Sequence, residues 1–334
     1  MRLVAGVKIF SIVVGVFLAS PKFIACMSPS DSIEVKHNLS SSLRSLSPIP
    51  LRIARADSSA LRLSQSGQFR DEAFHPKVSY SRLAFIGGTS LAVGVGVHIY
   101  QNRAWWLGTR APFHVENDWS YAMNFDKIGH FWAAELLSSI YADLYKWAGV
   151  ERKQALLYSA ATGFLYELYV EIEDGLHRDW GFSPGDAFGD VLGAFYPILQ
   201  EQFPFLQNFS LKWSYLPNRE YLDRYGTNHA FIDDYQGTTF WATARIHNLL
   251  PGPARDYWPG FLNLAVGLNV QKIYQGGRGE RHWFISLDYD LESLPGEGAF
   301  WKSLKRVLNH VHFPAPAVQI SPNVVWYGMF FTVR

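Results

Sequence analysis

Three apolar stretches of helical character each carry two ionisable side chains that lie four residues apart. The pairs are Asp126 and His130, Glu167 and Glu171, and Asp186 and Asp190. Four residues make about one turn of an α-helix, so both members of a pair face the same side. Ionisable groups in an apolar core are costly unless they are paired, hydrogen-bonded or bound to a metal ion. The chain must therefore fold so that several helices bring these groups together.

The composition argues against a nucleic-acid-binding protein and favours a membrane-associated one. The chain has 334 residues, of which 18% are charged and 16% aromatic, and its net charge is +1. A nucleic-acid-binding surface needs an excess of Lys and Arg, so we expect no nucleic-acid partner. Few charges and many aromatic rings are typical of a membrane-associated protein, whose partners would be membrane lipids. A soluble protein with a large core is the alternative.

Residues 1–27 have the pattern of an export signal. Arg2 and Lys8 precede an apolar run, 9–19, that is too short to span a bilayer. Cys26, the single cysteine, follows Phe-Ile-Ala and resembles the lipidated cysteine of bacterial lipoproteins. Simple cleavage near Ala25 is the alternative. Residues 28–76 are rich in Ser and lack hydrophobic periodicity, which predicts a disordered tether.

Four helices are predicted in a membrane-associated region, 77–207. Residues 83–100 are long and apolar enough to cross a membrane, although a buried helix of a soluble protein would have the same composition. Capping residues delimit the other three helices, with Asn124 and Ser183 as N-caps and Gly175 as a C-terminal stop. The predicted ranges are 124–147, 152–174 and 184–202.

After residue 208 the hydrophobic period changes from that of a helix to that of a strand. Five strands are predicted, at 211–216, 240–247, 262–271, 283–291 and 323–334. Residues 298–311 indicate a helix, which Pro314 and Pro316 end. Large side chains alternating with small polar ones also occur in outer-membrane strands, but a closed membrane barrel needs at least about eight strands. We therefore expect an α+β fold, with a helical bundle followed by a β-rich region, 208–334, that contains a half-buried antiparallel sheet.

The first helical pair joins a carboxylate to a histidine. Asp126 and His130, with Lys127 beside Asp126, suit an orienting carboxylate and a base or metal ligand. Acids also favour the first turn of a helix, and a lone histidine is often a satisfied core residue. Both interpretations stay open for this pair.

Glu167, Glu171 and Asp174 form a stripe along the next helix. The last two fall in its final turn, where the helix dipole disfavours a negative charge by roughly 0.3–1 kcal/mol. Groups that could compensate are a metal ion, Lys127, His130 and Arg178. Glu167 has apolar neighbours on both sides and is a candidate site residue, with a buried structural ion pair as the alternative.

Capping of the fourth helix explains Ser183 and Asp186, but Asp190 lies one turn further in, among apolar residues. Carboxylates and a histidine on facing helices occur in the metal sites of helical bundles, although the Glu-x-x-His motif of di-metal bundles is absent. An oxygen-rich set suits Mg²⁺ or Ca²⁺, since Zn²⁺ favours more histidines. The candidate ligands for a divalent cation are His130, Glu167, Glu171 and Asp190.

Two polar clusters in the C-terminal half have simpler interpretations. Residues 233–237, with the sequence Asp-Asp-Tyr-Gln-Gly, indicate a turn. Arg278, Arg281 and His282 form a basic cluster that could meet a phosphate head group, with an ordinary surface loop as the alternative.

The order of these motifs resembles that of a family of bacterial envelope proteins. The chain carries Asp126-Lys127-Ile128-Gly129-His130-Phe131, Tyr166-Glu167, Glu171 with Asp174-Gly175, and Trp180-Gly181-Phe182-Ser183 with Asp186 and Gly193. Over about 126–200 these motifs resemble the YfiM-like family of predicted periplasmic lipoproteins, and residues 234–241, 286–290 and 313–317 resemble its longer Bacteroidetes-type version. More distantly, the order is similar to VanZ-like membrane proteins. The resemblance implies an exported, membrane-associated protein that faces the periplasm, and it supplies no catalytic residues.

Two classes of function remain. The first is a non-catalytic envelope protein, in which the polar cluster locks the helices together or binds a lipid head group. The second is a membrane-embedded hydrolase or transferase that acts on a lipid-linked substrate. In that case His130 and Glu167 would act as base or ligands, and Asp186 and Asp190 as ligands or orienting groups. Because no complete catalytic motif is present, the first class is preferred.

Overall fold

The structure is a computed structural model that describes residues 77–226, 231–274 and 279–330. The predicted export signal, the Ser-rich tether, Cys26 and Arg278 lie outside the described residues.

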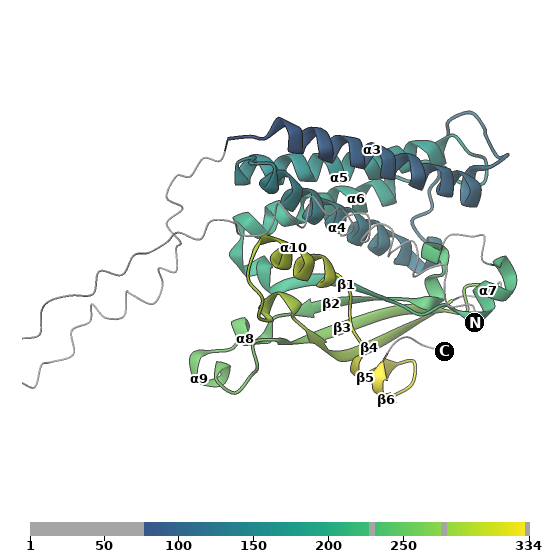
Figure 1. Cartoon of the computed structure of the whole chain (residues 1–334). Helices are drawn as coiled ribbons and strands as arrows, with labels where there is room; N and C mark the ends of the chain where they lie inside the picture. The colour runs from purple at the N-terminus through teal and green to yellow at the C-terminus, as the bar shows by residue number, and fades with distance from the viewer. Residues whose placement is uncertain (1–76, 227–230, 275–278, 331–334) are drawn as a thin grey trace, which may run out of the picture.

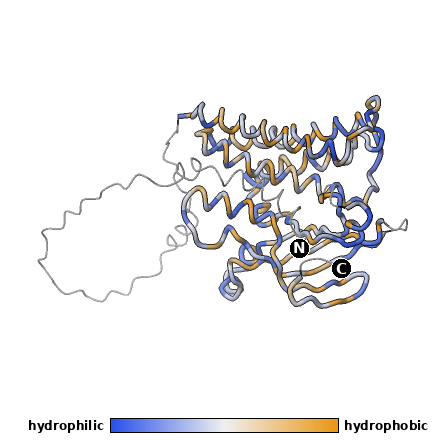
Figure 2. Tube along the Cα trace, turned by 45° about the vertical axis from the view of Figure 1, so that its right-hand side comes forward, coloured by the Kyte–Doolittle hydropathy of each residue, from blue (hydrophilic) through white to orange (hydrophobic). Residues whose placement is uncertain are grey.

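Four long helices lie over one six-stranded antiparallel sheet (Figure 1). They are α3 (Tyr80–Gln101), α4 (Phe125–Trp147), α5 (Arg152–Gly175) and α6 (Pro184–Gln202). Their ranges confirm the predicted helices to within a few residues at each end. Hydrophobic residues recur along all of them (Figure 2). By length and composition, Tyr80–Trp106 is the one stretch of the described chain that could cross a membrane.

Of the three predicted capping residues, Ser183 caps its helix as predicted, whereas Asn124 and Gly175 act differently. Ser183 is the N-cap of α6, and its hydroxyl accepts the backbone N–H of Asp186. Asn124 is the N-cap of α4, but its side-chain amide donates to the carbonyl of Trp119 and makes no cap hydrogen bond. Gly175 ends α5 for another reason than the one predicted. It does not adopt a positive φ, and an added Cβ would lie 2.5 Å from the ring of Phe113, so packing requires the glycine.

Two glycines bring α6 against α4. A Cβ on Gly189 would lie 2.8 Å from the carbonyl oxygen of Lys127. A Cβ on Gly193 would lie 2.8 Å from the carbonyl carbon of Phe131 and closer still to its oxygen. The two backbones therefore meet without intervening side chains, which places Asp186 and Asp190 of α6 opposite the first two turns of α4.

The sheet is a meander in which each strand pairs with the one before it. Its strands are β1 (Phe209–Tyr215), β2 (Thr238–Ala244), β3 (Leu262–Gln271), β4 (Glu280–Tyr289), β5 (Ala315–Ser321) and β6 (Val325–Phe330). Four short helices connect them: α7 (Arg219–Tyr225), α8 (Ile246–Leu249), α9 (Gly252–Arg255) and α10 (Ala299–Leu308). The sequence predicted five strands and missed β5, because Pro314 and Pro316 indicated a terminator. Pro316 lies where the β5–β6 register shifts, a position that does not need its N–H.

The face of the sheet that carries its small and polar residues is buried. Lys212 and Asp288 are ion-paired at 2.8 Å and are 0% and 1% exposed. Asn263 donates to the same carboxylate, and His312 stacks on Trp241. The buried polar residues of this face include Lys212, Ser214, Thr239, Thr243, Asn263, Asn269, Ser286, Asp288 and Gln319.

The opposite, apolar face of the sheet divides into two parts. One part packs on α4, where Phe240 and Val270 contact Phe125 in a buried cluster. The other part is exposed: Val266 and Ile285 are cross-strand partners and are 47% and 46% exposed. The predicted half-buried sheet is therefore confirmed, with its buried half richer in polar groups than the alternation alone indicated.

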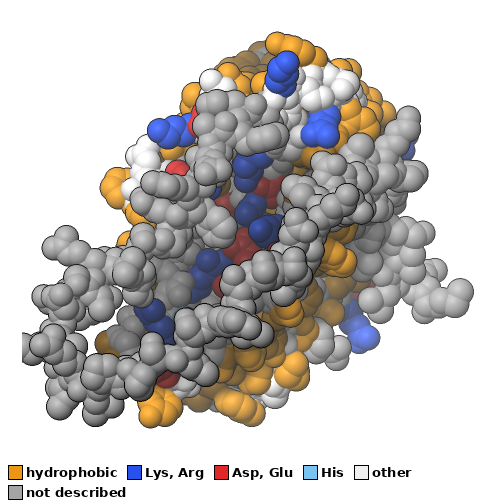
Figure 3. Space-filling model, turned by 60° about the vertical axis from the view of Figure 1, so that its left-hand side comes forward, with side chains coloured by type: hydrophobic (Ala, Val, Ile, Leu, Met, Phe, Trp, Pro, Cys, Tyr) orange, Lys and Arg blue, Asp and Glu red, His pale blue; other side chains and the backbone are white. Residues whose placement is uncertain are grey.

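Ion pairs also join the helices to the segments around the sheet. Arg306 of α10 pairs with Asp143 of α4 and with Glu292, and Arg245 pairs with Glu292. On the face shown in Figure 3, acidic and basic side chains lie close together near the centre, and hydrophobic side chains are visible towards the edges.

Candidate functional site

A cavity of about 780 Å³ lies between the helices and the sheet. Aromatic rings contribute much of its lining on the sheet side and at the end of α3. These include Trp105, Trp132, Trp213, Phe231, Tyr235 and Phe240. The cavity also reaches the polar residues at the N-terminal ends of α4 and α6 and along α5. The helical pairs predicted from the sequence thus meet at one wall of a single cavity.

Lys127 connects three segments at this wall. Its ammonium group is 2.7 Å from Asp118, 2.9 Å from Asp186 and 3.4 Å from Asp126. Burial lowers the pKa of Lys127, but the negative charges and hydrogen bonds of these carboxylates outweigh it and raise the pKa. Ser183 donates to Asp118 at 2.5 Å and completes the group. Lys127 is thus held as a cation between the starts of α4 and α6.

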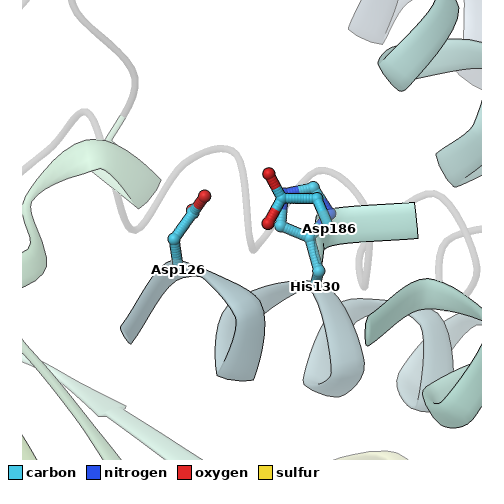
Figure 4. Close-up of side chains that lie close together, drawn as sticks. All are labelled: Asp126, His130 and Asp186. Carbon is cyan, nitrogen blue, oxygen red and sulfur yellow. The ribbon is translucent and has the colours of Figure 1, made fainter. Parts of the chain in front are cut away.

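His130 lies one turn further along α4. Its Nδ1 atom is 3.0 Å from a carboxylate oxygen of Asp190, and its Nε2 atom is 3.8 Å from Asp186. Figure 4 shows Asp126 and His130 on the same helix with Asp186 beside the imidazole ring. Burial lowers the pKa of His130, but the hydrogen bond and charge of Asp190 raise it well above its usual value. The ring is therefore oriented by Asp190 and favours the protonated form.

The stripe on α5 faces the same cavity. Glu171 accepts the backbone N–H of Ser183 at 2.9 Å, and Asp174 accepts the indole N–H of Trp106 at 2.6 Å. Glu167 is 7% exposed and makes no hydrogen bond to a described residue. Burial is the main cause that raises the pKa of Glu167 to about 8, of Glu171 to about 9 and of Asp174 to about 6. Glu167 and Glu171 therefore hold protons at neutral pH unless another positive charge reaches them, whereas Asp174 is mostly ionised there.

The structure brings together all the site residues that the sequence singled out: Asp126, Lys127, His130, Glu167, Glu171, Asp174, Ser183, Asp186 and Asp190. Two details differ from expectation. Asp186 does more than cap α6, since it also contacts Lys127 and His130. Arg178 lines the cavity, but Trp106, rather than Arg178, is the hydrogen-bond donor to Asp174.

Several cavity residues were missed or read differently. Asp118 lies between the first and second predicted helices, and no periodic pattern marks it. Asp233 was assigned to a turn, yet it lines the cavity and accepts the indole N–H of Trp105 at 2.7 Å. Tyr235, in the same turn, donates to Asp126 at 2.6 Å. Arg281, part of the predicted basic cluster, donates to the backbone carbonyl of Met123 and so supports the start of α4. Arg281 also donates to the side-chain oxygen of Asn124 at 2.9 Å.

Two overlapping groups could hold a cation. Asp126, His130 and Asp186 form one, and His130, Glu167 and Asp190 form the other. In each group, one ligand atom per residue lies within 4.8 Å of the others. Glu171 is close to the second group, with an oxygen 3.9 Å from His130.

Glu135, on α4 outside this cavity, gives a test of how burial acts on carboxyls in this fold. The residue is 3% exposed, and burial raises its pKa from 4.5 to about 8. The folded protein therefore holds a proton that the unfolded chain loses, so the free energy of unfolding should fall as pH rises from 4.5 through about 8. Glu135→Gln should reduce this decrease in the free energy of unfolding.

The decrease is measured as the difference between the melting temperatures at about pH 6 and about pH 9, with Glu173→Gln as the control. An unchanged slope in Glu135→Gln would contradict this account.

One family model matches the chain. It is described as "Predicted periplasmic lipoprotein (DUF2279)" and covers residues 116–202, the segment that carries the charged wall of the cavity. No curated protein and no solved structure matches. The match supports the predicted location, an exported and envelope-associated protein that faces the periplasm. It also fits an envelope protein whose function is uncharacterised.

Proposed function

We propose that this envelope protein binds an amphipathic small molecule, such as a lipid, in the cavity between its helices and its sheet, without catalysis. The observation that carries the proposal is the cavity itself, which combines a volume of about 780 Å³ with an aromatic side and a charged side. Ligand pockets of roughly 300–1,000 Å³ with apolar walls and a few convergent polar groups are usual for small molecules. The aromatic side would take the apolar part of the ligand, and the charged wall would take its polar head.

The charges of the lining indicate the chemistry of that head. Two basic side chains, His130 and Arg178, are among the lining residues. The acidic ones are Glu116, Asp118, Asp126, Glu167, Glu171, Asp174, Asp179, Asp186 and Asp233. An excess of acids favours a head that brings positive charge or hydrogen-bond donors, and the faces of Trp rings also attract cations. An amine-bearing amphiphile therefore fits this cavity better than one whose head carries a negative charge alone.

Ala133 offers a way to fill the cavity without touching the charged wall. It lines the cavity on α4, so Ala133→Phe should occupy ligand space and lower ligand affinity about ten-fold or more, or roughly 1.4 kcal/mol. The measurement is calorimetric titration with lysophosphatidylethanolamine and with lysophosphatidylglycerol of the same chain length. The amine-bearing lipid should bind the wild type more tightly.

The matched control is Leu165→Phe, which adds an aromatic ring at a position on α5 that is 61% exposed. Its affinity for the amine-bearing lipid should equal that of the wild type. The proposal fails if the wild type binds neither lipid, or if Ala133→Phe binds both as well as Leu165→Phe does.

A hydrolase or transferase acting on a lipid-linked substrate is the second candidate, and one observation favours it. Asp190 holds the imidazole of His130 at 3.0 Å, and Glu167 lies in the same group of ligand atoms. A base oriented by a carboxylate beside a second acid is an arrangement that proton transfer can use. Turnover of an ester or phosphoester substrate by the wild type, abolished in a folded Glu167→Gln variant, would replace the binding role by this one.

A further inference from the structure

Three helices each contribute one ligand-type side chain to a single point at the charged wall. His130 comes from α4, Glu167 from α5 and Asp190 from α6, and one ligand atom of each lies within 4.8 Å of the other two. Glu167 is 7% exposed and Asp190 is 0% exposed. Both carboxylates are therefore largely shielded from the bulk solvent that could screen their charges.

The hydrogen bonds of the described residues leave this group unsatisfied. One oxygen of Asp190 accepts from His130, and the other is buried without a hydrogen-bond partner. Glu167 likewise has no hydrogen-bond partner among the described residues, although it lines the cavity. Buried carboxylate oxygens are normally paired, hydrogen-bonded or bound to a cation. Asp190 therefore has a buried oxygen without a hydrogen-bond partner, and the carboxyl group of Glu167 lies beside it at the cavity.

In the neighbouring group of Asp126, His130 and Asp186, one oxygen of Asp186 also has no hydrogen-bond partner, but an ion pair compensates its charge. Lys127 already supplies an ammonium group at 2.9 Å from Asp186 and 3.4 Å from Asp126. A divalent cation placed there would meet the positive charge of Lys127. Lys127 makes no ion pair with Glu167 or Asp190 among the described residues. The charge distribution thus separates a half of the wall that Lys127 neutralises from a half in which, among the described residues, the titratable imidazole of His130 is the cationic group beside Glu167 and Asp190.

We infer that His130, Glu167 and Asp190 bind a divalent transition-metal cation, with the nearby oxygen of Glu171 available as a fourth ligand. One imidazole nitrogen and two or three carboxylate oxygens form a mixed set that suits Mn²⁺ better than Ca²⁺, which prefers oxygen ligands alone, and better than Zn²⁺, which favours more histidines. Metal–ligand bonds of about 2.0–2.2 Å place adjacent ligand atoms roughly 3.0–3.5 Å apart. His130 Nδ1 and Asp190 lie 3.0 Å apart in a hydrogen bond, and the metal ion would replace the proton that they share without a large movement of either atom. The site stands independently of the proposed amphiphile.

The test uses the full chain, purified in detergent, stripped of metal by a chelator and dialysed against Mn²⁺ or Zn²⁺. Elemental analysis should find about one metal ion per chain in the wild type. Glu167→Gln keeps the size of the side chain and removes its charge, so metal affinity should fall about ten-fold or more. Glu173→Gln, on the same helix but outside the lining of the cavity, should bind metal as the wild type does.

Absence of bound metal in the wild type overturns the inference, and so does equal affinity in the Glu167→Gln and Glu173→Gln variants. If Glu167→Gln does not fold, pulsed electron paramagnetic resonance of the Mn²⁺-loaded wild type decides. One directly coordinated imidazole nitrogen is expected, and an all-oxygen shell overturns the inference. Ala133→Phe separates the two proposals, because it should lose the amphiphile and keep the metal.

Discussion

Replacing Lys127 with methionine is expected to lower the free energy of unfolding by about 3–5 kcal/mol. The ammonium group is buried and contacts Asp118, Asp126 and Asp186, which come from the loop before α4, from α4 and from α6. Methionine has a similar length and no charge, so the packing is kept while three carboxylates lose their common cation. The cost arises because charges that were paired become uncompensated in a buried place. Equilibrium denaturation in urea measures the loss.

The control for this variant is Lys146→Met, in the last turn of the same helix. Lys146 pairs with Asp143, but its side chain is 38% exposed. Exposed ion pairs contribute about 0–1 kcal/mol, so this variant should stay close to the wild type. A loss of similar size in both variants would mean that Lys127 contributes through its apolar stem and not through its charge.

Gly193→Ala is expected to cost about 3 kcal/mol or more, although it adds one methyl group. The new Cβ would lie inside contact distance of the backbone of Phe131, so either α6 or α4 must move. Backbone cannot rotate out of the way as a flexible side chain can. The same displacement would separate Asp190 from His130, so the variant should also lose ligand affinity at the charged wall. Thermal unfolding and the calorimetric titration measure the two effects.

Gly88→Ala is the matched control, since it is also a glycine-to-alanine change inside a long helix. No heavy atom lies within 4 Å of a Cβ built on Gly88. Alanine has the higher helix propensity, by about 1 kcal/mol, so this variant should be as stable as the wild type or more so. Equal behaviour of the two variants would contradict the account of close backbone packing between α4 and α6.

Local signals in the sequence were sufficient for the helices. Ser183 followed by Pro184 fixes the start of α6, and the acids four residues apart mark which side of each helix turns inward. The strands were predicted less completely. Alternation located β3 to the residue, but β5 contains Pro316 and so lacks the local signal on which such a prediction depends.

Site residues that lie far from the helical pairs in the sequence could not be predicted. The pairs on α4, α5 and α6 could be found because helical periodicity links their members within seven residues. Asp118, Asp233 and Trp105 reach the cavity from loops or from a helix end, and no periodic pattern connects them to it. Which carboxylate meets which donor depends on close contacts such as those of Gly189 and Gly193. Such contacts are a property of the packed helices and cannot be read from spacing.

The buried polar face of the sheet has a consequence for how the chain reaches its native pairing. A shift by one residue would turn Asn263 and Asn269 outward and carry leucines into their places. A register that separates Lys212 from Asp288 would leave both charges buried and unpaired. Such a sheet would have a much lower stability than the native one. In this meander every strand after β1 pairs with the strand that precedes it in the sequence. The sequential pairing of strands and the buried polar groups together favour the native register over mispaired sheets.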